Sequence, residues 1–315
     1  MSDIDLSAVL APGEVAIGVD IGGTKTLAVA FGPRGPLASA RVATIRGAEG
    51  IVDSLHRAVA TLRAHDDVAT GNILSIGIGI PGIVDSSRGI VSHGVNVGVT
   101  DELPLARLIR DVEGVPTGVT NDVSAATIGA AHTAGVSNDA ALIALGTGLA
   151  AGFLISGEPR AGFTYSAGEI GHIPYVLDGL PCQCGQRGCL ELYASGSALD
   201  RLWPTPVGVK AGASLFAAAA AGDEEAITAR TTWVRAIAHA VTIVGLTVDV
   251  EAIFIGGGLS EIGEPLRAAI QAELEERAST SAFLEHLNLA GRFSLVPSQS
   301  CVGAIGAALV GLRQR

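Results

Sequence analysis

The chain has 315 residues, of which 48% are hydrophobic and 16% are charged, and its net charge is −11. This length can bury a sizeable core and, at roughly 100–200 residues per domain, predicts two domains. The composition excludes a disordered protein, and the apolar runs are too short for a bundle of membrane-spanning helices. The acidic balance, without a cluster of Lys and Arg, argues against a nucleic-acid partner.

The first residues, MSDIDLSAVLAPGEV, are acidic and lack a long apolar stretch. A secretion signal would have a basic start and an apolar run, so we expect a cytosolic protein. Residues 140–157 are uncharged over about the length of a membrane span. Glycine and threonine residues break this segment into two β-like halves, which favours a pair of strands over a spanning helix.

The first predicted element is a hairpin. The stretch EVAIGVDIGGTKTLAVAF, residues 14–31, alternates as a strand does, turns at Gly22 and Gly23, and returns as a second strand. The elements that follow in chain order are a helix at 50–65, a buried strand at 73–82, an amphipathic stretch at 103–112, a strand ending in PTGVTND, and a helix from 122 that Gly135 closes.

The second half of the chain repeats this pattern. Its predicted elements are strands at 140–146 and 149–156 around a glycine turn, a long helix at 223–247, a strand at 251–258, a helix at 262–277 and a strand at 292–297. Residues 201–212 are the most linker-like segment and predict a surface loop. Each half starts with a Gly-Thr hairpin, and one last helix is left over. We therefore expect one α/β domain from residues 1–121 plus 301–315 and a second from residues 122–300.

The motif DIGGTK has the features of an anion-binding turn. Asp20 ends a strand, and the glycines Gly22 and Gly23 let consecutive backbone N–H groups converge. Thr24 adds a hydroxyl donor and Lys25 adds a cation, so phosphate is the expected guest. An ordinary hairpin turn is the alternative interpretation of this motif alone.

Two later stretches, ALGTGLAAG at 144–152 and IFIGGGLS at 253–260, contain similar strand-to-glycine turns. Three such turns together favour phosphate binding over chance. A P-loop is excluded because it needs a Gly-Lys pair, whereas Lys25 follows Thr and Lys210 follows Val. A dinucleotide fingerprint needs a strand-to-helix turn, but GTGLAAG is followed by strand-like sequence, which argues against a hydride-transfer enzyme.

The pair Asn121-Asp122 lies where a predicted strand passes into a helix. Asn and Asp at this position commonly cap the helix by accepting its free N–H groups. The functional alternative makes Asp122 a general base that accepts a proton from a hydroxyl as it attacks phosphorus. Asn121 would then bind the same substrate by hydrogen bonds.

The stretch GEIGHIPYVLDGLPCQCGQRGCLE brings together the residue types of a metal site. Cys182, Cys184 and Cys189 form C-x-C-x-x-x-x-C, and His172 precedes them across a loop that can fold back. Three thiolates and one imidazole predict a tetrahedral structural zinc site. Disulfides are the competing interpretation, but they are rare in cytosolic proteins, and Cys182–Cys184 would close a strained ring. Cys301, inside an apolar helix, predicts a buried structural thiol.

Two carboxylates, Glu169 and Glu191, flank the predicted metal loop from either end. Exposed glutamates are usually solvated surface residues. A metal that fixes the loop would also fix both carboxylates, and together with the Asn-Asp pair they indicate a pocket for a polyol.

The motifs DIGGTK, GIPGIV, ND at 121–122, LGTG, GEIGH and CQCGQRGCLE, in this order and spacing, resemble the ROK family of sugar kinases, transcriptional repressors and open reading frames. The resemblance covers about residues 15–312, and C-x-C-G-x-x-G-C-x-E is its most specific part. It implies an actin-like, hexokinase-type (ribonuclease H-like) ATPase fold, with two α/β domains that close on sugar and ATP across an interdomain cleft.

The resemblance also implies roles for individual residues, with Asp122 as the catalytic base. The sugar-binding residues would be Gly82, Asn96, Asn121, Asp122, Glu169, His172 and Glu191. The residues around the ATP phosphates and Mg²⁺ would be Asp20, Gly22, Gly23, Thr24, Lys25, Gly146, Thr147 and Gly148, and the residues at the adenosine would be Gly256, Gly257 and Gly258. His172 and the three cysteines would hold zinc, and the second ring nitrogen of His172 would face a sugar hydroxyl.

The sequence departs from the family pattern at two places. Family members that act as glucokinases commonly read N-L-x-W after the sugar-contacting Asn, whereas residues 96–99 read N-V-G-V. The missing aromatic leaves the identity of the sugar open. After the second glycine turn, Ala150 and Ala151 stand where glycines are usual, and their Cβ atoms would alter how closely ATP approaches.

These observations and the resemblance predict an ATP-dependent hexose kinase that acts on the 6-hydroxyl of glucose or a closely related hexose. The alternatives are a kinase for an amino sugar, such as N-acetylmannosamine or 3-amino-3-deoxyglucose, and a non-catalytic sugar sensor. A repressor is disfavoured because only about 14 residues precede the first hairpin, too few for a helix-turn-helix. The resemblance also implies a homodimer or homotetramer.

Overall fold

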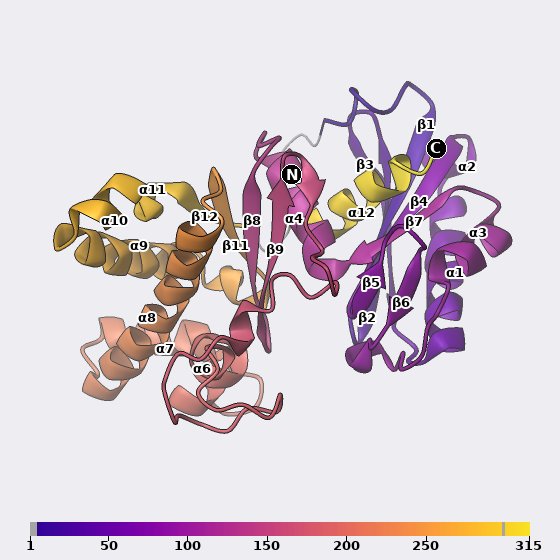
Figure 1. Ribbon diagram of the computed structural model, residues 1–315. Coiled ribbons are helices and arrows are strands. Elements are labelled where there is room, and N and C mark those ends of the chain that lie inside the picture. The colour runs from indigo at the N-terminus through magenta and orange to yellow at the C-terminus, as the bar shows by residue number, and fades with distance from the viewer. Residues whose placement is uncertain (1–4, 298–299) are drawn as a thin grey trace. The chain divides into compact units, whose positions relative to one another are not determined.

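The computed structural model describes residues 5–297 and 300–315, which form two compact units (Figure 1). The first unit consists of the described residues of Met1–Ser137, Glu158–Ser166 and Cys301–Arg315, and the second of those of Asn138–Gly157 and Ala167–Ser300.

The units divide after Ser137, whereas we expected a division after residue 121. The helix between these points, α4 (Asp122–Thr133), packs on the C-terminal helix α12 (Val302–Leu312), which belongs to the first unit. This packing, which the repeated strand pattern does not reveal, keeps α4 in the first unit.

A five-stranded sheet forms the centre of the first unit, in the order β3-β2-β1-β4-β7. Its strands are β1 (Glu14–Ile21), β2 (Lys25–Gly32), β3 (Gly35–Ala43), β4 (Asn72–Ile80) and β7 (Thr117–Asn121). The predicted hairpin is confirmed as β1 and β2, which pair antiparallel, and β3, which we did not predict, extends it. Strands β1, β4 and β7 are parallel, so their carboxyl ends meet at one edge.

Helices cover both faces of this sheet (Figure 1). Alternate residues of β1 point to opposite sides: Ile17 and Val19 lie in a core with helices α1 and α3, whereas Ala16 lies in a core with α12. The elements of this unit that complete the list are α1 (Ala48–Arg63), α2 (Asp66–Ala69), β5 (Ile83–Asp85), β6 (Ile90–Ser92), η1 (Val95–Val97) and α3 (Leu105–Glu113).

Helix α12 contacts the sheet and α4 at backbone-to-backbone distance. A Cβ atom added to Gly18 of β1 or Gly77 of β4 would lie 1.8 or 1.6 Å from a carbonyl oxygen of α12. A Cβ atom on Gly306 of α12 would lie 1.8 Å from the carbonyl oxygen of Ala125 in α4. Only glycine permits such close approach, so the glycines fix where α12 lies.

The second unit contains the sheet β10-β9-β8-β11-β12. Its strands are β8 (Ala140–Leu145), β9 (Leu149–Ile155), β10 (Glu158–Pro159), β11 (Ala252–Gly256) and β12 (Phe293–Leu295). The uncharged segment 140–157 is therefore a pair of strands, as predicted. None of the helices in the described part of the chain combines the length and apolar character that a membrane crossing requires.

The long helix α8 (Glu224–Thr247) supplies much of the core of the second unit, through residues such as Trp233, Ile237 and Val241, each 0% exposed. Helices α5, α7 and α9 pack on α8. The elements of this unit, other than α8 and the strands, are η2 (Ile170–His172), α5 (Glu191–Ala194), α6 (Gly196–Leu202), α7 (Ala211–Ala220), η3 (Gly258–Ile262), α9 (Glu264–Ser279), α10 (Ala282–Leu287) and α11 (Leu289–Arg292).

We predict that Gly77→Ala destabilises the protein by about 3 kcal/mol or more, at the upper end for overpacking, because its methyl group would overlap the backbone of α12. The matched control is Gly114→Ala, where φ is 73° and nothing lies within 4 Å of an added Cβ. This control should cost only about 1–2 kcal/mol of left-handed strain. Urea unfolding followed by circular dichroism compares the two, and equal losses would contradict the close contact of α12.

Candidate functional site

In the first unit, the carboxyl ends of the parallel strands gather the polar residues that the sequence singled out. Asp20 pairs with Gly79 across β1 and β4, and Asn121 pairs with Ile80 across β7 and β4. Asp122 follows as the first residue of α4. Ligands of open α/β sheets bind at this edge, where strand ends leave polar side chains and backbone groups exposed.

Asn121 caps helix α4. Its Oδ1 accepts hydrogen bonds from the N–H groups of Val123 (2.9 Å) and Ser124 (3.3 Å), and its Nδ2 donates to the carbonyl oxygen of Gly82 (3.2 Å). Of the Asn121-Asp122 pair, Asn121 is therefore the residue that caps the helix. The same hydrogen bonds attach the start of α4 to the loop after β4, so Gly82, Asn121 and Asp122 are held together.

Asp20 carries an unusual pKa. Burial, followed by repulsion from the nearby Asp122 carboxylate, raises the pKa of Asp20 from 3.8 to about 6. Two carboxylates whose charges repel each other at the end of parallel strands favour a cation between or beside them.

The first glycine turn is closely packed. The N–H of Gly22 donates to the carbonyl oxygen of Lys25, and the hydroxyl of Thr44 donates to the carbonyl oxygen of Gly22. A Cβ atom on Gly23 would lie 3.1 Å from the carbonyl oxygen of Asn96, so the turn and the Asn96 loop are in contact. Asp20, the residues of the DIGGTK turn and Asn96 thus belong to one region of the first unit.

The valines after Asn96 face the core. Val97 is 0% exposed and Val99, at the position of the usual aromatic, is 3% exposed. Val99 therefore packs beneath the Asn96 loop and contributes no side chain to the surface of that loop. Asn96 itself is exposed.

In the second unit, the two remaining glycine turns lie side by side because they follow the neighbouring parallel strands β8 and β11. Gly257 has a φ of 92°, and a Cβ there would lie 2.3 Å from the carbonyl oxygen of Leu145. Ala150 and Ala151 lie inside strand β9, so the turn itself comprises only Gly146, Thr147 and Gly148.

Residues 191–197 support this second glycine turn. The N–H of Leu149 donates to Glu191 Oε2 (3.0 Å), and the N–H of Gly196 donates to the carbonyl oxygen of Gly146 (2.8 Å). The hydroxyl of Ser197 donates to the carbonyl oxygen of Thr147 (2.9 Å). We did not predict roles for Gly196 and Ser197, because neither belongs to a motif and only the fold brings them to the turn.

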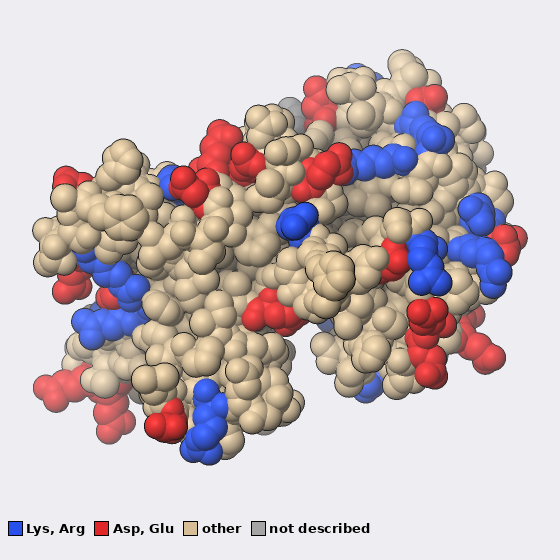
Figure 2. Space-filling view, viewed as in Figure 1, with Lys and Arg blue, Asp and Glu red and all other residues tan. Residues whose placement is uncertain are grey.

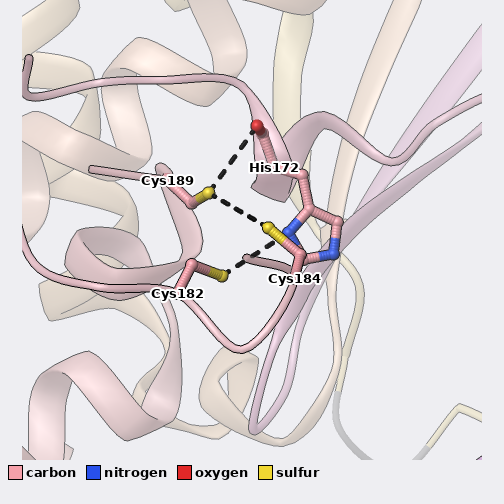
Figure 3. Close-up of side chains that lie close together, drawn as sticks. All are labelled: His172, Cys182, Cys184 and Cys189. Atoms are coloured by element: carbon pink, nitrogen blue, oxygen red, sulfur yellow. Dashed lines mark hydrogen bonds between the residues drawn. The ribbon is translucent and has the colours of Figure 1, made fainter. Parts of the chain in front are cut away.

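The predicted metal-binding residues converge (Figure 3). A ring nitrogen of His172 and the Sγ atoms of Cys182, Cys184 and Cys189 all lie within 4.8 Å of one another. His172 Nδ1 is 3.8 Å from Cys182 Sγ, and the Sγ atoms of Cys184 and Cys189 are 3.6 Å apart. Tetrahedral zinc with Zn–S bonds of about 2.3 Å and a Zn–N bond of about 2.0 Å separates its ligand atoms by about 3.5–3.8 Å. The cluster fits such an ion.

The thiols of the cluster differ in pKa. Hydrogen bonds from the backbone and side chain of Gln186 lower the pKa of the Cys184 thiol to about 6, which favours the thiolate that metals bind, whereas burial and the neighbouring thiols raise the pKa of the Cys189 thiol to about 12. The remaining cysteine, Cys301, lies outside the cluster as the half-buried N-cap residue of α12, where burial raises its pKa. It precedes the helix, whereas we expected it inside.

Two glycines hold Glu169 and His172 against strand β9. Added Cβ atoms on Gly168 and Gly171 would lie 1.8 and 2.2 Å from carbonyl oxygens of that strand. While His172 directs Nδ1 at the thiols, its Nε2 lies 3.9 Å from Glu169 Oε2. One ring nitrogen therefore faces the cluster and the other faces a carboxylate.

Each unit thus brings together its share of the predicted residues. The first holds Asp20, the DIGGTK turn, Gly82, Asn96, Asn121 and Asp122, and the second holds the two further glycine turns, Glu169, Glu191 and the thiol–imidazole cluster. On the face drawn in Figure 2, Lys and Arg side chains are interspersed with Asp and Glu in each unit.

This chain is similar to known proteins along most of its length. The model of the ROK family matches residues 16–312. The chain is 34% identical to a glucokinase of Streptomyces coelicolor over 272 residues, 79% of this chain and 84% of the relative. It is 29% identical to an N-acetylmannosamine kinase of Yersinia pseudotuberculosis over 249 residues, 77% of this chain and 82% of the relative.

A ROK family glucokinase from Streptomyces griseus, solved in complex with glucose and AMPPNP, superposes on this chain with a TM-score of 0.73 at 32% identity. The superposition covers 95% of this chain and 99% of the glucokinase chain. The ROK hexokinase from Thermus thermophilus has a TM-score of 0.74 at 26% identity, covering 94% and 97%. The expected fold class, an α/β fold of the actin-like, hexokinase type with two domains, is confirmed. The chain belongs to the ROK family.

Proposed function

We propose that this protein is an ATP-dependent hexose kinase that transfers the γ-phosphoryl group to the 6-hydroxyl of glucose or a closely related hexose. The observation that carries the proposal is Asp122, which Asn121 and Gly82 hold at the carboxyl edge of the first sheet. Strand β4 lies between the strand that leads to Asp122 and the strand that carries Asp20. Support comes from the identity to the Streptomyces coelicolor glucokinase and from the glucose and AMPPNP in the Streptomyces griseus structure.

A kinase for an amino sugar is the second candidate, because the chain is also 29% identical to an N-acetylmannosamine kinase. The buried Val99 supplies no aromatic surface that would favour either sugar. Glucose and N-acetylmannosamine are therefore the first two substrates to compare.

In the proposed reaction, Asp122 accepts the proton of the 6-hydroxyl as this oxygen attacks the γ-phosphorus. Asn96, Asn121, Glu169, His172 and Glu191 bind the sugar hydroxyls, and the glycine turns donate backbone N–H groups to the phosphates. Asp20 would hold Mg²⁺, which would neutralise charge on the phosphates.

A structural zinc would be held by His172 Nδ1 and the three cysteine sulfurs. The segment 173–190 contributes few residues to the hydrophobic core. Coordination of the metal, in place of core packing, would therefore make this segment rigid. This rigidity would fix Glu169 at one end of the loop and Glu191 at the other.

We predict that Asp122→Asn lowers kcat by about 10²–10⁴-fold, the usual contribution of a general base, while sugar binding persists. A coupled assay of ADP release with glucose and N-acetylmannosamine measures turnover, and calorimetry measures binding. Asp111→Asn, which changes an exposed carboxylate on α3, is the matched control. Absence of sugar-stimulated ADP release in the wild type would refute the kinase and favour a sugar sensor.

The metal site makes a separate prediction. Wild-type protein should contain one zinc per chain, and Cys189→Ser should lower zinc affinity by at least about 100-fold, more than the loss of a supporting contact. Cys301→Ser, which changes the cysteine outside the cluster, should keep the metal. Elemental analysis of the purified proteins measures this. Equal zinc content in both variants would show that the four residues are not the ligands.

The raised pKa of Asp20 predicts that removing its charge stabilises the protein at neutral pH. Its pKa is higher in the folded protein than the unperturbed 3.8, so its contribution to stability is present below about pH 4 and is lost as the pH rises through about 6. Asp20→Asn should therefore raise the free energy of unfolding at about pH 7.5 by up to about 3 kcal/mol. Urea unfolding at about pH 4 should show no gain, and a similar gain at both pH values would rule out the titration of Asp20 as its cause.

A further inference from the structure

One glycine of the C-terminal helix contacts the side chain of Asp20. Gly303 lies in the first turn of α12, and a Cβ atom added to it would lie 2.7 Å from Oδ2, 2.8 Å from Cγ and 3.3 Å from Cβ of Asp20. These distances are too short for a methyl group, so a side chain at position 303 requires either the helix or the carboxylate to move.

Backbone contacts restrain the helix on two sides. On the sheet side, Gly18 contacts the backbone of Ala304, one residue after Gly303. On the other side, an added Cβ on Gly129 of α4 would lie 1.9 Å from the carbonyl oxygen of Val302, one residue before Gly303. Because backbone atoms hold both neighbours of Gly303, the Asp20 side chain is the part that would shift.

The other glycines of α12 have a different explanation. Gly306 and Gly311 lie against backbone atoms, of Ala125 and of Gly77 and Ile76, so helix packing alone requires them. At Gly303 the close neighbour is the side chain of a residue at the carboxyl edge of the sheet. Glycine is a poor helix former, and its presence here satisfies a constraint that the packing of α12 does not impose.

We propose that Gly303 is a positioning residue that leaves room for the Asp20 carboxylate and so fixes its orientation toward bound Mg²⁺ and nucleotide. The inference rests on the proposed function, in which Asp20 serves the phosphates. The first turn of α12 thereby sets the orientation of one carboxylate, while α4, which packs on the same helix, carries Asp122. A helix that is distant in sequence from both aspartates thus determines the positions of their side chains at the edge of the sheet.

The first test is nucleotide binding. Gly303→Ala should weaken the binding of Mg²⁺·AMPPNP by about tenfold, equivalent to about 1.4 kcal/mol, and leave glucose binding within about twofold of wild type. Gly118→Ala is the matched control, because its Cβ would lie 2.9 Å from the carbonyl oxygen of Val310 at the other end of α12. It should lower stability without changing nucleotide affinity. Wild-type affinity in Gly303→Ala, or an equal loss in Gly118→Ala, would overturn the proposal.

The second test is a double-mutant cycle on thermal stability, which requires no kinase activity. In the wild-type background, Gly303→Ala should lower the unfolding midpoint by about 2 °C or more. In the Asp20→Ala background, where Oδ2 and Cγ are gone, the same change should raise the midpoint, because alanine is the better helix former. Equal shifts in both backgrounds refute the contact. The cycle can show the expected opposite shifts while Mg²⁺·AMPPNP binds neither to the wild type nor to Gly303→Ala. In that case the proposed function fails and the Gly303–Asp20 contact stands.

Discussion

The first unit depends on the close contact of the C-terminal helix α12 with strands β1 and β4 and with helix α4. The contact is made by backbone atoms, since glycines such as Gly18, Gly77 and Gly306 stand where any side chain would collide. Strand β1 ends at the candidate site, with Asp20 near its end, and helix α4 begins there with Asp122. The packing of one helix therefore sets the geometry of two acidic residues more than 100 positions apart along the chain.

The second unit orders its functional loops in another way. Its loop between His172 and Cys189 has few core residues, and a metal bound by the four ligand-type atoms, which lie within 4.8 Å of one another, would hold this loop in place. The segment that leaves this loop supports the second glycine turn through Glu191 and Ser197. One short stretch of chain therefore follows the metal-type cluster and is connected by hydrogen bonds to the second glycine turn.

Many residues of the candidate site could be named from the sequence because they belong to short motifs. The thiols and His172 lie close in sequence, and the Asn121-Asp122 pair marks a strand-to-helix junction. Contacts between distant segments were not predictable. The sequence around Ser197 has no motif, strand β3 lacks a clear alternation, and nothing local at Gly303 points to Asp20. Such contacts arise from the packing of complete elements, which local patterns do not encode.

By itself, the sequence determined the two Gly-Thr hairpins, several of the main strands and helices, the glycine turns, the four metal-type ligands and the family, since each of these follows from residue types at short spacing. The tertiary structure decided that α4 belongs with α12, that Val99 faces the core beneath Asn96, and that burial beside Asp122 raises the pKa of Asp20. The physical reason is that burial, close packing and charge repulsion depend on distances through space, which only the folded chain defines.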